Sequence, residues 1–157
     1  MNAGRFDYVM RIHPFTRQLW HGVFAKDEKI PHEPNLTGDI YLLNTAPSHH
    51  PGEHWCVLFR QNNVCEIFDS YGHPPSFYNL HIPASKEIVY NPYQLQGPLS
   101  RTCGHHCLFF ALHRAQGLSF LNIVTKLYSP QSPYKVNDNM VVNFVFSCLG
   151  KTLAKIE

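Results

Sequence analysis

The pattern of apolar and polar positions divides the chain into a strand-rich first part and a helical second part. Short apolar runs bounded by Pro, Gly, Asn or Ser predict strands at residues 39–44, 54–60, 65–71 and 87–90. The run at 54–60 is almost continuously apolar, which predicts a strand that is buried on both faces. Residues 1–35 mix aromatic, charged and proline residues, and they predict only a short helix and loops around Phe15–Phe24.

Longer apolar segments after residue 100 predict helices at 103–115, 119–128 and 137–149. The middle of the first helix, Cys-Leu-Phe-Phe-Ala-Leu, is too apolar for an exposed helix and indicates a buried one. Strands followed by helices are typical of an α+β fold, and we expect a mixed central sheet packed by helices. The length of 157 residues suits one domain, residues 1–157.

Composition limits the function classes. A net charge of +2 gives no electrostatic footprint for nucleic acid, so DNA binding is expected to be weak or absent. No apolar run reaches the roughly 18 residues that a membrane helix needs, and the first residues show no secretory pattern. Five cysteines without framework spacing favour a reducing, intracellular compartment.

Cys103 is the strongest candidate nucleophile among the cysteines. With Thr102 or Ser100 as N-cap, it lies in the first turn of the buried helix, where free N–H groups and the helix dipole favour the thiolate. Gly104 follows it and is expected to leave room for a substrate backbone. The alternative is an inert buried cysteine, which is the commoner role of this residue type.

The predicted hairpin of the second and third strands supplies a base. If the turn at residues 61–64 has an even length, His54 lies opposite Tyr71, and Asp69 lies on the same face, one diagonal step away. Asp69 would then orient His54 and stabilise its imidazolium, as the acid of a catalytic triad does. A turn of odd length would place the two on opposite faces, and each residue alone also fits an ordinary strand end.

Gln96 completes the set. It lies in a Gln-Gly-Pro-Leu-Ser loop that leads to the predicted helix start, where its amide can donate toward an oxyanion beside the Cys103 N–H. Considered by itself, a glutamine before Gly-Pro is an ordinary turn residue. The four candidates lie in the chain order His54, Asp69, Gln96, Cys103, and together they supply the groups that a thiol hydrolase needs.

This order resembles the adenain family, the maturation proteases of adenoviruses. The resemblance lies in Leu95-Gln-Gly-Pro-Leu-Ser-Arg-Thr-Cys-Gly-His-His-Cys, in Gly52-Glu-His-Trp-Cys and in Phe68-Asp-Ser-Tyr-Gly. Asn44-Thr-Ala and Gly22-Val-Phe also fit, so the resemblance spans roughly residues 20–150. Adenovirus enzymes often have Glu at the position of Asp69, while the wider clan uses Asp.

The resemblance implies a cysteine endopeptidase with a papain-like catalytic arrangement. In it His54 would be the base, Asp69 its orienting acid, Gln96 part of the oxyanion hole and Cys103 the nucleophile. It also implies capsid or core precursor proteins of an adenovirus-like virus or Polinton-type element as substrates, cleavage after Gly, and the host nucleus or the virion as location. No cofactor and no metal are expected. The disulfide-linked activating peptide of the adenovirus enzyme has no counterpart, because Ser85 stands where its cysteine would be. Any activating peptide should therefore bind non-covalently, for example along the edge of the sheet at residues 87–90.

Three other interpretations remain open from the sequence. A deconjugating protease for SUMO or other ubiquitin-like modifiers shares the clan and residue order, although the Gln-Gly-Pro-x-Ser-x-x-Cys-Gly loop and the small size favour the viral type. A metal-binding module would use either His105, His106 and Cys107 or His49, His50 and His54, but finger-like ligand spacing is absent. A catalytically inactive binding module is the third.

Overall fold

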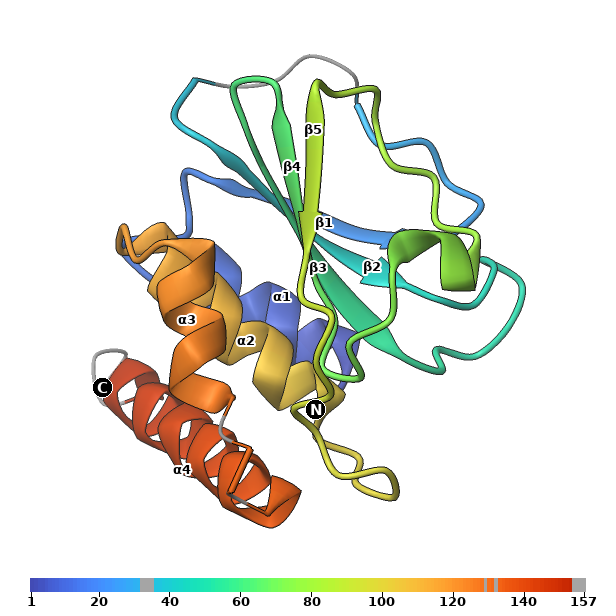
Figure 1. Ribbon diagram of the computed structural model, residues 1–157. Coiled ribbons are helices and arrows are strands. Elements are labelled where there is room, and N and C mark those ends of the chain that lie inside the picture. The colour runs from blue at the N-terminus through green and yellow to red at the C-terminus, as the bar shows by residue number, and fades with distance from the viewer. Residues whose placement is uncertain (32–35, 129, 132, 154–157) are drawn as a thin grey trace.

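The computed structural model describes residues 1–31, 36–128, 130–131 and 133–153 (Figure 1). Its elements, in chain order, are α1 (Ala3–Ile12), β1 (Trp20–Ala25), β2 (Asp39–Asn44), β3 (Trp55–Gln61), β4 (Val64–Phe68), the short 3-10 helix Pro75–Tyr78, β5 (Glu87–Tyr90), α2 (Cys103–Ala115), α3 (Phe120–Leu127) and α4 (Tyr134–Leu153).

The strands form one five-stranded sheet in the order β1-β2-β3-β4-β5. The three central strands β2, β3 and β4 run antiparallel to one another, whereas β1 runs parallel to β2 and β5 runs parallel to β4. The predicted α+β fold with a mixed central sheet packed by helices is therefore confirmed.

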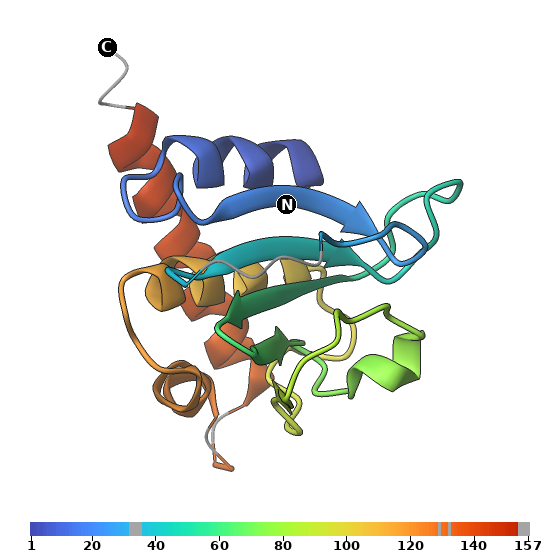
Figure 2. The same cartoon turned by 90° about the horizontal axis from the view of Figure 1, so that it is seen from above.

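The helices cover one face of the sheet. Side chains such as Leu42, Val57 and Phe68 meet apolar residues of α1, α2, α3 and α4 in the main core. Figure 2 shows α1 running alongside β1, and Figure 1 shows α4 on the outer side of α2. A smaller core on the opposite face includes Leu58 and Ile67 and is covered in part by the segment around the 3-10 helix. All five central residues of β3 are buried, as its apolar run predicts.

The β3–β4 hairpin has the predicted even register. Gln61 pairs with Val64 and Val57 pairs with Phe68, which leaves Asn62-Asn63 as a two-residue turn. Asn62 adopts a left-handed conformation with φ 53°, which asparagine tolerates better than most residues. Residues that follow β4 are thereby brought toward residues that precede β3.

The prediction for the N-terminal region is wrong. The helix lies at Ala3–Ile12, and Trp20–Ala25 forms an edge strand where loops were expected. Phe6, Val9 and Met10 of α1 are buried, and they follow the spacing of one helix face. The strand is hard to see in the sequence because Gly22 and a register shift between Trp20 and Gly22 interrupt it, and because its parallel partner is remote in the chain.

Other boundaries differ by a few residues. β4 ends at Phe68, not Tyr71, because the chain turns at Asp69, whose carbonyl accepts from the N–H of Gly72 (2.9 Å). α4 is longer than predicted at both ends. β5 and α2 have the predicted bounds, and α3 lies within its predicted range with Ser119 as N-cap.

Candidate active site

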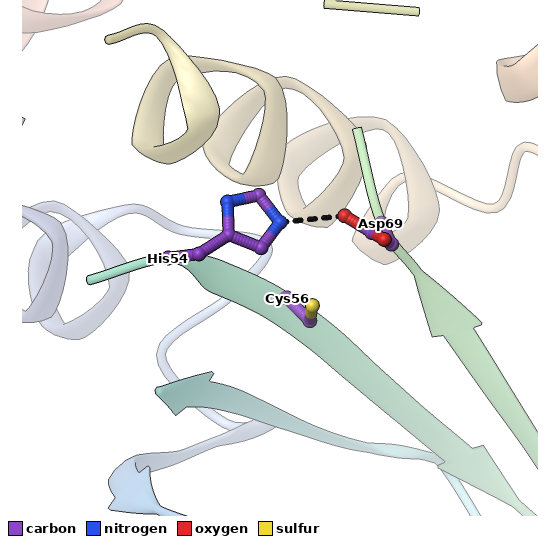
Figure 3. Close-up of side chains that lie close together, drawn as sticks. All are labelled: His54, Cys56 and Asp69. Atoms are coloured by element: carbon purple, nitrogen blue, oxygen red, sulfur yellow. Dashed lines mark hydrogen bonds and ion pairs between the residues drawn. The ribbon is translucent and has the colours of Figure 1, made fainter. Parts of the chain in front are cut away.

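His54 and Asp69 lie at adjacent ends of two paired strands. His54 immediately precedes β3 and Asp69 immediately follows β4, so the hairpin register brings their side chains together. His54 Nε2 donates to Asp69 Oδ1 over 2.6 Å, and both residues are buried (Figure 3). The ring of Tyr71 packs 4.7 Å from that of His54, as the predicted pairing requires. Nδ1 of His54 remains for another partner.

The Asp69 carboxylate receives four hydrogen bonds. Besides His54, the N–H groups of Tyr71 (3.0 Å) and His73 (2.9 Å) and the hydroxyl of Tyr78 (2.9 Å) donate to it. Burial would raise the pKa of Asp69, but the hydrogen bond and charge of His54, with the two N–H donors, hold it below its ordinary value. Asp69 is therefore an anion that orients the imidazole.

Asn91 fixes the backbone of Asp69 and was missed by the sequence prediction. Its Oδ1 accepts from the Asp69 N–H (2.9 Å), and its Nδ2 donates to the Asp69 carbonyl (2.6 Å) and to the Tyr93 carbonyl (3.3 Å). Gly72 packs so closely in the same turn that a Cβ would collide with the backbone of Tyr93. An asparagine just after an edge strand carries no sequence signal for this role.

Cys103 is the first residue of α2, as predicted, and its side chain hydrogen-bonds with His54. Burial would raise the pKa of Cys103, but His54 and the backbone groups of Trp55 and Gly104 lower it below its ordinary value. Burial would likewise lower the pKa of His54, but Asp69 and Cys103 raise it to about 9. Both shifts favour a thiolate–imidazolium pair over a neutral thiol and imidazole.

Cys107 ties this helix to β3. Its Sγ–H donates to the carbonyl of Trp55 over 3.2 Å, one helical turn after Cys103. Cys107 is fully buried, and burial raises the pKa of its thiol, so it serves as a structural donor. The backbone of Trp55 therefore contacts the thiols of both Cys103 and Cys107. These contacts fix where α2 lies along β3, and so they hold Cys103 beside His54.

Gln96 lies in a fixed orientation beside the thiol. The Ser70 hydroxyl donates to its Oε1 (2.6 Å), and its Nε2 donates to the carbonyl of Ser100 (2.8 Å) and to the Tyr71 hydroxyl (3.3 Å). Its side chain is buried. An open cavity of about 470 Å³ has Gly52, His54, Trp55, Tyr71, Gln96 and Cys103 in its wall.

The structure thus brings His54, Gln96 and Cys103 to one cavity and places Asp69 directly behind His54. Thr102 occupies the predicted N-cap position, although its side chain makes no capping hydrogen bond. One detail of the sequence interpretation is wrong. The space beside Gly104 is taken by Met1, whose Cβ and carbonyl oxygen would lie 3.1 and 3.2 Å from a Cβ there. Both outcomes follow from packing against segments that are remote in the sequence.

A metal site was also considered. The ligand atoms of His54, Cys56 and Asp69 lie within 4.8 Å of one another, and this donor set suits zinc. However, His54 and Asp69 already hydrogen-bond to each other, and burial raises the pKa of the Cys56 thiol well above its ordinary value, which opposes the thiolate that a metal needs. In the part of the chain that the structure describes, neither histidine set suggested by the sequence forms such a cluster.

No protein-family model and no curated protein matches the chain. Among solved structures, it is similar to the one titled "Crystal Structure of Se-Met ASFV pS273R protease", with 20% identity and a TM-score of 0.43. The match covers 65% of this chain and 43% of that one. A likeness of this size does not assign a function, so the function has to be inferred from the residues of this chain.

No helix in the described residues combines the length and the apolar character that crossing a membrane requires.

The pairing of Asp69 with His54 predicts a specific response to pH. In Asp69→Asn the pKa of His54 should fall, because the carboxylate that stabilises the imidazolium is lost, and the pKa of Cys103 should rise with it. The rate of Cys103 alkylation by iodoacetamide, followed by mass spectrometry against pH, should therefore shift to higher pH in the variant. The buried thiols of Cys56 and Cys107 serve as internal controls that stay unmodified. Identical profiles for both proteins would contradict the proposed ion pair.

Proposed function

We propose that the chain is a cysteine endopeptidase. The observation that carries this proposal is the hydrogen-bonded series Cys103–His54–Asp69, with the pKa of the thiol lowered and that of the imidazole raised to about 9. This is the arrangement that an activated thiol nucleophile requires.

The proposed reaction follows the order of these groups. The Cys103 thiolate attacks the scissile carbonyl carbon, and the developing oxyanion accepts from the Cys103 N–H, which has no partner within the helix, and from the Gln96 amide. His54 then transfers its proton to the leaving amine, which leaves a thioester on Cys103. Water, deprotonated by His54, attacks the thioester; the thiolate departs, and the imidazolium is restored.

For Gln96 to donate to the oxyanion, one of its two donated hydrogen bonds has to give way. The contact with the Tyr71 hydroxyl is the longer of the two, at 3.3 Å against 2.8 Å, so it is the one that we expect to exchange. The Ser70 hydroxyl holds Oε1 throughout and keeps the NH2 group directed to the cavity.

We further propose that the substrates are precursor proteins of a virus or virus-like element, cut after Gly in the host nucleus or in the virion. Support comes from the resemblance of the Gln96–Cys103 segment to adenain and from the close packing of the cavity rim at Gly52. A Cβ at Gly52 would lie only 2.9 Å from both Trp55 and Asn44, so this edge is already closely packed. Such a rim leaves little space for a side chain beside the scissile bond.

Cleavage of a peptide library by the reduced protein tests the substrate class. We expect cuts after Gly, none after Arg or Phe, and none with Cys103→Ala, which should fold normally. Cys148→Ala, which removes a thiol on α4 instead, is the matched control and should cut as the wild type does. Processing of SUMO or ubiquitin fusions without cleavage of short Gly-containing peptides would point instead to a deconjugating protease, and the absence of any cleavage would oppose an enzyme.

The oxyanion assignment predicts a split between kinetic constants. Gln96→Ala should lower kcat by about 10²–10³-fold and change KM little, because the oxyanion exists only along the reaction path. Steady-state kinetics on the best library peptide measure both constants. A rise in KM alone would make Gln96 a substrate contact.

Activation is proposed to differ from the adenovirus scheme. Ser85 cannot form the disulfide, and Cys65, which lies near Ser85 in space, is fully buried. β5 is at the edge of the sheet in the described residues, with Ile88 and Tyr90 exposed, so a peptide can add there as a strand without a covalent bond. The net charge of +2 offers few phosphate contacts.

The bare, fully reduced protein should therefore turn over peptide at moderate salt without DNA. Addition of duplex DNA should change kcat/KM less than about twofold, because few phosphate contacts give a shallow salt dependence. Peptidase assays with and without DNA, in the presence of a reductant, provide the measurement. A protein that is inert until DNA or an oxidised peptide adduct is supplied would contradict this expectation.

A further inference from the structure

Asp138 of α4 connects the two loop segments that present the proposed oxyanion donors. Its Oδ2 accepts from the N–H of Gly97 (3.2 Å), and its Oδ1 accepts from the Thr102 hydroxyl (2.7 Å) and from Nε2 of His106 (3.0 Å). Gly97 directly follows Gln96, and Thr102 directly precedes Cys103. The Asp138 carboxylate therefore joins the residue that follows Gln96 to the residue that precedes Cys103.

The protonation state of this cluster supports a fixed structure. Burial would raise the pKa of Asp138, but His106, Thr102 and the Gly97 N–H lower it, so the residue is an anion. Burial lowers the pKa of His106, which is fully buried, so its neutral ring donates from Nε2. Hydrogen bonds to a charged group are stronger than neutral ones, and a partly buried carboxylate needs such donors to offset its desolvation.

The loop between Gln96 and Cys103 depends on such external contacts. It contains no helix or strand, and Leu99 at its tip is almost fully exposed, so apolar packing holds its centre only weakly. On the other side of Gln96, the Asn137 side chain donates to the carbonyl of Leu95 over 3.0 Å. Two consecutive residues of α4 thus hold the chain on either side of the Gln96 side chain.

We propose that Asp138 is a positioning residue for the oxyanion hole: it sets the distance between the Gln96 amide and the N–H of Cys103. The inference rests on the proposed function, because it assigns Asp138 to the same reaction. It does not require Asp138 to touch substrate. Removal of the carboxylate should separate the two donors and leave the Cys103–His54–Asp69 series as it is.

The test is a double-mutant cycle on peptide cleavage. Asp138→Asn keeps the shape of the side chain, but only one of its two terminal atoms can accept a hydrogen bond, so the contact with either Gly97 or Thr102 is lost. The kcat should therefore fall roughly 10²-fold with little change in KM. The alkylation rate of Cys103 against pH should be unchanged, because His54 is untouched. Gln96→Ala combined with Asp138→Asn should be about as slow as Gln96→Ala alone, since both act through one donor.

Two further variants keep the test decisive. Asn139→Ala alters an exposed neighbour on α4 and should match the wild type. Thr102→Val removes a single hydrogen bond to Asp138 and should lower kcat by about tenfold; it replaces Asp138→Asn in the cycle if urea unfolding shows that the latter does not fold. Multiplicative losses in the double variant, a shifted alkylation profile or an unchanged kcat would each overturn the inference. Absence of peptidase activity in the wild type would instead overturn the proposed function.

Discussion

The packing of the first two turns of α2 against the start of β3 is the constraint on which the rest of the site depends. The peptide of Trp55 lies between two thiols of that helix, with its carbonyl accepting from Cys107 and its backbone hydrogen-bonding to Cys103. Since His54 directly precedes Trp55, this contact fixes the position of α2, and therefore of Cys103, relative to the imidazole of His54. A helix shifted by one residue would turn Cys103 away from the cavity by about 100°.

The electrostatics of the site are a balance between burial and pairing. Burial opposes charge on Cys103, His54 and Asp69 alike. Their mutual hydrogen bonds and charges, together with backbone N–H donors to Asp69 and Cys103, reverse that tendency. Hydrogen bonds to charged groups contribute about 1.5–3 kcal/mol each, so a carboxylate with four donors can remain ionised in a buried place. Asn91 and Tyr78 belong to the proposed catalytic arrangement in this sense, because both hydrogen-bond to Asp69.

The side of the cavity that contains Gln96 is built differently. His54 and Asp69 stand at strand ends, whereas Gln96 lies on a loop whose position depends on contacts from other elements. Ser70, shortly after β4, contacts both the backbone and the side chain of Gln96. The Ser70 carbonyl accepts from the N–H groups of Leu95 and Gln96 (2.8 and 3.0 Å), and the Ser70 hydroxyl donates to Oε1 of Gln96. α4 holds the other side. The loop is thereby fixed between the sheet and the outermost helix.

The sequence by itself determined most of the local elements after residue 38 and singled out the four residues that are proposed for the site. The sequence located a hairpin around Asn62-Asn63 but left the length of its turn open. The structure shows the even register, which places Asp69 beside His54. The buried helix at Cys103 followed from its apolar composition. These features depend on residues close together in the chain, where turn geometry and periodicity are readable.

Only the tertiary structure decided the contacts that fix those residues. The parallel edge strand β1, the clamp of Asn91 on Asp69, the position of Met1 against Gly104 and the reach of Asp138 from α4 all join segments remote in sequence. Asn91 and Asp138 are ordinary polar residues in their local context, and they gain a role only because the fold places an unpaired N–H or hydroxyl beside them. Such pairings are decided by packing between elements, because every buried polar group must find a partner wherever the chain provides one.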